Sequence, residues 1–118
     1  MLSKKNRLTK SSSFKATYCQ NRVVSDEFFV LFAGKNKQKD DIETKIGFVV
    51  SKKIDKRATV RNKIKRRLRE AMGQYLKENN PPYISLIYKA KENSVNADYN
   101  SILKSVYKLM DKLANKIF

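Results

Sequence analysis

The stretch IGFVVSKKIDKRATVRNKIKRRLREAMGQYL, Ile46–Leu76, says most about the fold. Its first five residues, Ile46–Val50, form an uninterrupted apolar run, which predicts a buried strand. A basic loop follows, Ser51–Arg57. Over residues 58–79 apolar side chains then recur at steps of three and four, which predicts an amphipathic helix. Two prolines, at positions 81 and 82, end that helix.

Similar apolar runs lie on either side of this stretch. The runs FFVLF, Phe28–Phe32, and YISLIY, Tyr83–Tyr88, each predict a buried strand. A short extra strand is expected near Arg22–Ser25. Because strands that follow each other along the chain usually pair, the simplest topology joins Phe28–Phe32 to Ile46–Val50 as a hairpin.

Two further helices are predicted near the ends of the chain. Ser11–Ser13 are placed to cap a short helix that begins at Phe14. Asn96 or Asp98 is placed to cap a final amphipathic helix that runs to about Ile117. This order of elements predicts an α+β sandwich in which helices pack on one sheet.

The composition is strongly basic. Among 118 residues, 27 Lys and Arg outnumber 11 Asp and Glu, which gives a net charge of +16, while 41% of the residues are apolar. The apolar share suffices for one domain over residues 1–118, with residues 1–10 as a basic flexible arm. Such a charge repels itself unless a polyanion neutralises it, so nucleic acid is the first expected partner and an anionic membrane surface the second. No apolar run is long enough to span a membrane.

The residue types that are absent or rare restrict the chemistry. The chain has no histidine, which excludes a Ser-His-Asp triad and a histidine metal ligand. Its one cysteine, Cys19, excludes an internal disulfide, and we expect a buried or idle thiol in a reducing cytosol. Asp40, Asp41 and Glu43 are close in sequence, but we interpret them as a solvated acidic turn. We therefore predict no catalytic residue and no metal ligand, and chemistry supplied by another molecule.

The helix predicted over residues 58–79 has two distinct sides. At about 100° per residue, one apolar stripe is expected to dock on the sheet: Ile64, Leu68, Ala71, Met72 and Tyr75. A polar flank lies beside this stripe: Asn62, Lys65, Arg66 and Arg69. Lys63 and Arg67 are predicted to point to the far side. Like charges stand four residues apart on the flank, which disfavours an isolated helix and is reversed by bound phosphates. The alternative is a solvated face that keeps the domain soluble.

The string KIGFVVSKKI, Lys45–Ile54, followed by RATVRNKIKRRLRE, Arg57–Glu70, resembles the signature of the bacterial ribonuclease P protein component. In that signature a strand ends in a Ser-Lys-Lys turn, and a basic loop leads into an Arg-Asn-x-x-Lys-Arg-x-x-Arg helix. The matching residues here are Arg61, Asn62, Lys65, Arg66 and Arg69. The opening of the chain, with Asn6-Arg7-Leu8, Phe14, Tyr18 and FFVLF, is similar to the family as well, so the resemblance covers nearly the whole chain.

The resemblance implies an α-β-β-β-α-β-α sandwich with a central, mostly antiparallel sheet and a left-handed crossover around the basic helix. It also implies the protein subunit of a cytoplasmic ribonucleoprotein. The catalytic RNA subunit of that complex, holding Mg²⁺, hydrolyses precursor tRNA and removes its 5′ leader, with no membrane and no further protein partner required. The side chains that are then expected to bind phosphates of the catalytic RNA are Lys52, Lys53, Arg57, Arg61, Asn62, Lys65, Arg66 and Arg69.

The family also implies a cleft beside the sheet for the single-stranded leader. Its aromatic positions match Phe14, Tyr18 and Phe32 here, and an aromatic ring stacks on a base of any identity. The family often has Tyr at the position of Phe32, so this chain lacks the hydroxyl there. The alternative interpretation of all three rings is ordinary core packing.

Two other functions remain open on the sequence alone. A structural RNA-binding protein of the ribosomal type, with no processing role, fits the composition and the basic helix equally well. A stand-alone protein nuclease fits poorly, because the chain has no histidine and no paired acids on a regular element. The glycine within the basic helix, Gly73, is compatible with close packing or with close approach of RNA.

Overall fold

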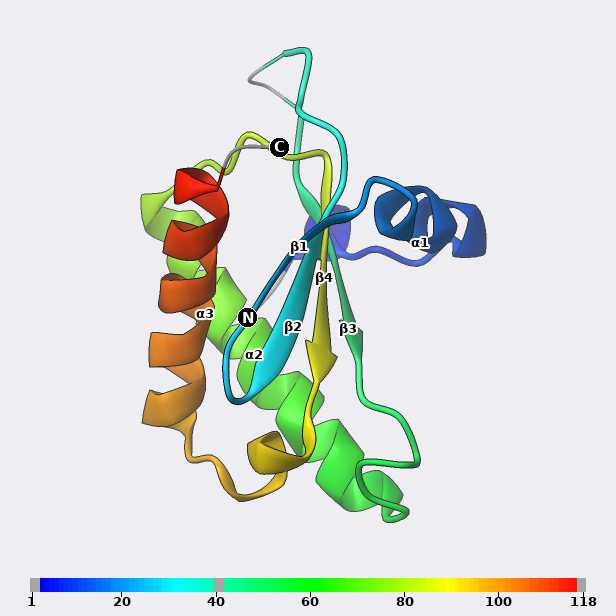
Figure 1. The fold of residues 1–118 in the computed structure, drawn as a ribbon, viewed down its shortest axis with the longest axis vertical. Helices are drawn as coiled ribbons and strands as arrows, with labels where there is room; N and C mark the ends of the chain where they lie inside the picture. The colour runs from blue at the N-terminus through cyan, green and yellow to red at the C-terminus, as the bar shows by residue number, and fades with distance from the viewer. Residues whose placement is uncertain (1–2, 40–41, 117–118) are drawn as a thin grey trace.

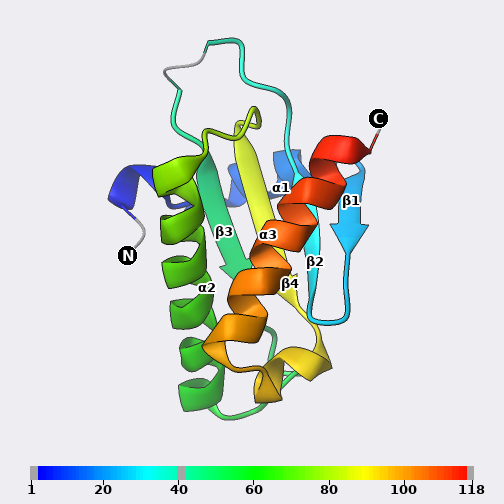
Figure 2. The same ribbon diagram turned by 90° about the vertical axis from the view of Figure 1, so that its left-hand side faces the viewer.

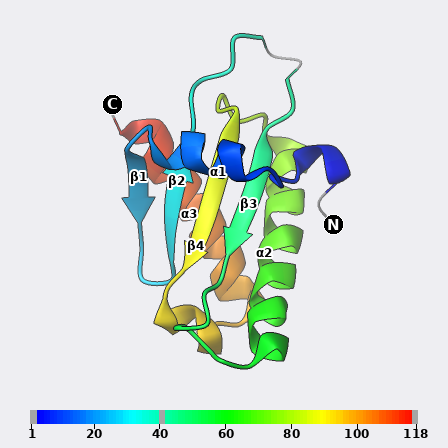
Figure 3. The ribbon, with the colours of Figure 1, turned by 90° about the vertical axis from the view of Figure 1, so that its right-hand side faces the viewer.

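The protein, a computed structural model that describes residues 3–39 and 42–116, is built on a four-stranded mixed sheet. In their order across the sheet, the strands are β1 (Arg22–Ser25), β2 (Phe29–Ala33), β4 (Ser85–Ala90) and β3 (Lys45–Val49). β2 pairs antiparallel with both β1 and β4, and β3 pairs parallel with β4 (Figure 3). The sheet is therefore mostly antiparallel, as the family resemblance implied.

Helices lie on both faces of this sheet. α2 (Ala58–Glu78) and α3 (Tyr99–Asn115) pack together on one face, and α1 (Ser11–Tyr18) lies on the other (Figure 1). Two 3₁₀ turns, η1 (Lys4–Asn6) and η2 (Glu92–Asn96), precede α1 and α3. The predicted α+β class is confirmed. β1 has the predicted range, and the bounds of the other strands and of α2 differ from the predicted ones by at most two residues.

The connection from β3 through α2 to β4 joins two neighbouring parallel strands. Figure 2 views the sheet from the side of α2 and α3, with β3 and β4 running downward and β4 to the right of β3. The chain therefore makes a left-handed crossover, the hand opposite to that of nearly all such connections. The family resemblance implied this hand, which hydrophobic periodicity does not determine.

The predicted hairpin between β2 and β3 is wrong, because β4 lies between these strands. Tyr88 of β4 is paired with Leu31 of β2 on one side and with Phe48 of β3 on the other. The physical reason is burial on both faces: Leu86, Ile87 and Tyr88 are consecutive and all 0% exposed, which only a central strand with cover on each side achieves.

The core fills the space between the sheet and the pair α2 and α3. Alternate strand residues point into it, among them Phe29, Leu31, Leu86 and Tyr88. The predicted stripe of α2 is confirmed, since Ile64, Leu68, Ala71 and Met72 are buried and Tyr75 is half-buried. Gly73 is buried as well, which favours close packing as its role.

Residues 3–10 are docked on the sheet, which corrects the prediction of a flexible arm. The side chain of Leu8 is buried, and its amide donates to the carbonyl oxygen of Ile46 at 3.0 Å. Asn6 Nδ2 donates to the carbonyl oxygen of Thr44 at 2.9 Å. One apolar residue within a basic segment carries no periodic signal, although it is enough to hold the segment against β3.

Three local predictions had different outcomes. α1 begins at Ser11 and not at Phe14, with Lys10 as its N-cap and no side-chain capping bond. The predicted cap of α3 is confirmed, because the Asp98 side chain accepts a hydrogen bond from the Ser101 amide at 2.8 Å. Cys19 is exposed at the end of α1, so of the two expectations, a buried or an idle thiol, the first is wrong and the second stays a prediction.

Candidate nucleic-acid interface

Five polar side chains form a cationic surface along the outer side of α2: Asn62, Lys63, Lys65, Arg66 and Arg69. We call this set the α2 ribbon. Four of its members, all but Lys65, line one shallow groove together with Thr59 and Glu70. Among the described residues, no ion pair involves any member of the ribbon. The ribbon therefore leaves its positive charge available to an external anion.

The opposite side of α2 faces the end of η2. Arg67 Nη1 donates to the carbonyl oxygen of Ala97 at 2.7 Å, so Arg67 points to the far side, as predicted. The prediction that Lys63 also points there is wrong, because Lys63 shares the groove with Asn62 and Arg66. The spacing in the sequence indicates this position. Lys63 precedes Arg66 by three residues and Glu70 by seven, and residues at these separations share a helix face.

The loop before α2 presents two lysines to solvent. The Ile54 amide donates to the carbonyl oxygen of Ser51 at 3.1 Å and closes a turn around Lys52 and Lys53. Both lysine side chains are exposed. The turn thus holds the two predicted phosphate-binding lysines at the start of the α2 ribbon.

Two arginines predicted to bind phosphates hold this loop in place. Arg57 Nε and Nη2 donate to the Asp55 carboxylate at 3.1 and 2.9 Å, and the Arg57 amide donates to the same group. These bonds lower the pKa of Asp55 to about 2. Arg61 Nη1 donates to the carbonyl oxygens of Asp55 and Lys56 at 3.0 and 2.8 Å. Arg61 therefore ties the loop to α2.

A second surface lies on the α1 side of the sheet, which we call the open face. Here the Tyr18 and Phe32 rings meet edge to face with centroids 4.8 Å apart. Phe14 packs over Gly47, where an added Cβ would lie 2.6 Å from two atoms of the Phe14 ring. Thr17 Oγ1 and Ser85 Oγ share a buried hydrogen bond of 2.6 Å. α1 is therefore fixed across the sheet, because its residues Phe14, Thr17 and Tyr18 contact β3, β4 and β2 in turn.

These three rings are half-buried, so they belong neither to the core nor to free solvent. Partial burial raises the pKa of the Tyr18 hydroxyl. The structure thus brings together Phe14, Tyr18 and Phe32, the three residues that the resemblance assigned to leader binding. A shallow groove beside α1 is lined by Phe14, Tyr18 and Asn21 among others.

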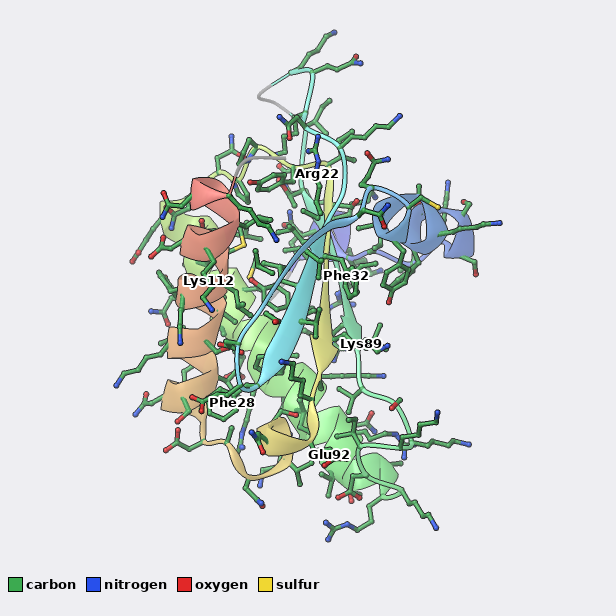
Figure 4. The ribbon with its side chains drawn as sticks, in the orientation of Figure 1. Arg22, Phe28, Phe32, Lys89, Glu92 and Lys112 are labelled. Atoms are coloured by element: carbon green, nitrogen blue, oxygen red, sulfur yellow. The ribbon has the colours of Figure 1, made fainter. Side chains whose placement is uncertain are left out.

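One lysine of the open face was missed in the sequence. Lys89 is exposed on β4, where it is paired with Val30 on one side and Val49 on the other. Figure 4 shows Lys89 and Phe32 on the same side of the sheet. The sequence could have indicated this position, because Lys89 stands two residues after Ile87 and residues two apart on a strand share a face.

The α2 ribbon and the open face lie on adjoining sides of the molecule. α2 runs along the β3 edge of the sheet (Figure 3). The side of α2 that carries Arg67 faces Ala97, just before α3, and the ribbon is centred on a different side of the helix. One RNA assembly can therefore contact both surfaces without passing around the protein.

No metal site is formed by the described part of the chain, in which no three His, Cys, Asp or Glu side chains cluster. Glu43 is exposed and pairs with Lys5 at 3.5 Å. Asp40 and Asp41 lie outside the described residues. In the described residues, no helix has the length and apolar character that crossing a membrane requires.

Comparisons of the sequence with known proteins point to one family. A family model described as Ribonuclease P matches residues 2–114. A ribonuclease P protein component of Clostridium botulinum is 29% identical over 109 residues, which cover 92% of this chain and 95% of the relative. The component of Caldanaerobacter subterraneus is 30% identical over 112 residues, or 95% of this chain and 92% of the relative.

Solved structures agree. The ribonuclease P protein of Staphylococcus aureus is 27% identical, with a TM-score of 0.78 over 93% of this chain and 95% of the other. The Thermotoga maritima protein, at 20% identity, shows the same fold with a TM-score of 0.76 over 90% of this chain and 96% of the other. The chain belongs to the ribonuclease P protein family, and its role is that of the protein subunit of an RNA-containing endoribonuclease in tRNA processing.

Proposed function

We propose that the two surfaces bind two different RNAs. The α2 ribbon, with Lys52 and Lys53, binds phosphates of the catalytic RNA, and the open face binds the single-stranded 5′ leader of precursor tRNA. One observation carries this proposal. A cationic helix side without ion pairs among the described residues adjoins a half-buried aromatic cluster on the neighbouring side of the fold.

The open face suits a strand of variable sequence. Stacking of a base on an aromatic ring contributes roughly 1–3 kcal/mol whatever the base. Lys89 lies in the next row of the same face and supplies a positive charge for the leader backbone. Mature tRNA has no leader, so this face favours the precursor over the product.

Hydrolysis is assigned to the RNA subunit with Mg²⁺, in the cytoplasm. Mg²⁺ is bound by oxygen ligands, and RNA phosphates supply them. The described side chains do not fit a Mg²⁺ cage, because their carboxylates are scattered. This chain's contribution is to neutralise phosphates near the metal ions and to hold the leader, and no step is routed through a protein-bound ion.

Leader-dependent affinity tests the proposal. The chain is reconstituted with a bacterial ribonuclease P RNA, and its affinity is measured for precursor tRNAs with leaders of increasing length and for mature tRNA. We expect the affinity to rise with each leader nucleotide until the open face is filled. Equal affinity for mature tRNA and every precursor contradicts leader binding.

Salt dependence tests the α2 ribbon separately. The variant Lys63→Gln/Arg66→Gln/Arg69→Gln is expected to lower the slope of log affinity against log salt by about 2–3, at roughly 0.7–0.9 for each phosphate that is no longer neutralised. The variant Lys63→Arg keeps the charge and should keep the slope. An unchanged slope in the triple variant would place the catalytic RNA elsewhere on the protein.

A further inference from the structure

A second cationic row runs along α3. Its members recur every four residues, which places the first three on one side of the helix, and the fourth is the C-cap residue: Lys104, Lys108, Lys112 and Lys116. We call this row the α3 ridge. At about 1.5 Å rise per residue, neighbouring members are about 6 Å apart along the helix axis. All four line the same shallow groove, together with Val24, Tyr107, Asn115 and one acid, Asp111.

The charges of the ridge are unfavourable for the helix alone. Lysines four residues apart repel one another, and Asp111 is the only acid within α3. The helix dipole favours cations in the last turn, which accounts for Lys112 and Lys116. It does not account for Lys104 and Lys108, which stand further from the C-terminus. This is the same imbalance that marks the α2 ribbon.

Contacts with β1 fix one end of the ridge. Lys112 Nζ donates to the carbonyl oxygen of Ser25 at 2.9 Å, and Lys116 Nζ donates to that of Val23 at 2.8 Å. Both acceptors belong to the edge strand β1, so these two lysines also protect a free strand edge. Lys104 and Lys108 are exposed, and no ion pair within the described residues involves either.

The ridge lies on a different side of the molecule from both surfaces described above. Figure 4 places Lys112 on α3 and Phe32 on the opposite side of the sheet. The α2 ribbon is centred on a different side of α2 from Arg67, which points toward the residues that precede α3. The ribbon and the ridge therefore face in different directions on a protein that measures 39 × 28 × 28 Å.

We propose that the α3 ridge binds the phosphate backbone of a second RNA segment. The protein then joins two parts of the ribonucleoprotein, one along α2 and one along α3. Val24 and Tyr107 are the apolar residues that line the groove beside the lysines. RNA is the polyanion that this family brings to the chain, and lysines bind phosphates without reading sequence.

The double variant Lys104→Gln/Lys108→Gln tests the ridge without touching the contacts to β1. We expect the slope of log affinity against log salt to fall by about 1.4–1.8, which is two phosphates at roughly 0.7–0.9 each. Lys35→Gln/Lys39→Gln is the matched control, because it removes the same charge from exposed loop positions outside every proposed surface. Lys104→Arg/Lys108→Arg should retain the original slope.

Two binding arms identify the RNA segment. A weaker affinity seen with the catalytic RNA alone places the ridge on that RNA, and a weaker affinity seen only when precursor tRNA is added places it on the tRNA. The proposal is overturned if the double variant and the loop control change the slope equally in both arms. It is also overturned if the double variant weakens binding to phosphatidylglycerol vesicles and leaves RNA binding unchanged. The α2 triple variant, measured in parallel, reports on the ribbon independently of these outcomes.

Discussion

The two faces of the sheet use alternate residues of the same strands and differ in what covers them. Toward α2 and α3, Phe29 and Leu31 are 0% exposed. Toward α1, their neighbours Val30 and Phe32 stay half-buried. The helices on the first face have 21 and 17 residues, whereas α1 has eight. The first face is a closed core, and the second keeps apolar side chains partly exposed, as the proposed binding of a leader requires.

The comparison predicts a large difference in how the faces respond to truncation. Leu68→Ala removes a fully buried side chain of the covered face and should lower the free energy of unfolding by about 2–5 kcal/mol. Val30→Ala on the open face should cost well under half of that, because its side chain already contacts solvent. Urea unfolding of both variants provides the measurement. Equal destabilisation would show that the open face is part of the core.

Truncation of a side chain on the open face should lower the affinity for precursor tRNA more than the free energy of unfolding. Tyr18→Ala removes a ring that contacts Phe32 and is expected to weaken binding of precursor tRNA by about 1–3 kcal/mol, while binding of mature tRNA is kept. Tyr18→Phe keeps the ring and serves as the control. The measurement is the affinity of the reconstituted complex, with each variant, for precursor tRNA and for mature tRNA. A variant that unfolds, or that binds both tRNAs equally weakly, would assign Tyr18 to packing.

The covered face was largely predictable from the sequence, and the open face was not. The stripe of α2 follows from a 3.6-residue period that shows contrast between apolar and polar residues. FFVLF has no such contrast, so nothing in it separates Phe29 and Leu31 from Val30 and Phe32. The strand order escaped prediction for a related reason, because it depends on pairing β2 with a strand more than fifty residues away.

In the candidate site, the family motif indicated which residues are basic but not which groups they contact in the folded chain. The family resemblance implied phosphate binding by Arg57 and Arg61, yet both donate to the loop around Asp55. Local geometry of that kind is set by the path of the loop, which the spacing of charges does not reveal. Lys63 was assigned to the wrong side because it occupies an unspecified position of the signature, and Lys89 was missed because it stands outside the signature. Helix and strand periods are compatible with the observed place of each.

Gly47 allows α1 to approach the open face closely. In Gly47→Ala the new Cβ would lie 2.6 Å from the Phe14 ring, so the ring must shift. We expect a decrease of about 1 kcal/mol in the free energy of unfolding, at the low end for overpacking because the ring is half-buried and has room to move outward. Amide exchange should quicken in α1 and remain unchanged in α2. The double variant Gly47→Ala/Phe14→Leu should recover part of the stability, and no recovery would contradict the contact.

The covered face holds one group that burial penalises. The Tyr88 hydroxyl is buried without a hydrogen-bond partner among the described residues, and an unsatisfied buried polar group is unfavourable by about 1–3 kcal/mol. Tyr88→Phe should therefore raise the free energy of unfolding slightly, by up to about 1 kcal/mol. Tyr107→Phe, whose hydroxyl bonds Glu78 on the surface, should change little. A clear destabilisation by Tyr88→Phe would reveal a partner for the hydroxyl.

The free energy of unfolding of Tyr88→Phe, measured against pH, tests whether the buried hydroxyl of Tyr88 resists ionisation. Burial raises the pKa of Tyr88 well above its ordinary value, because the phenolate is disfavoured in the core. Above a pH of about 10 the unfolded chain loses this proton first, so stability falls as the pH rises, by up to about 1.4 kcal/mol per pH unit. Tyr75 and Tyr83 also have a raised pKa, but they are present in both proteins and cancel in the difference. The advantage of Tyr88→Phe should therefore grow with pH above about 10, and parallel profiles for the two proteins would show that the hydroxyl ionises equally well in the folded chain.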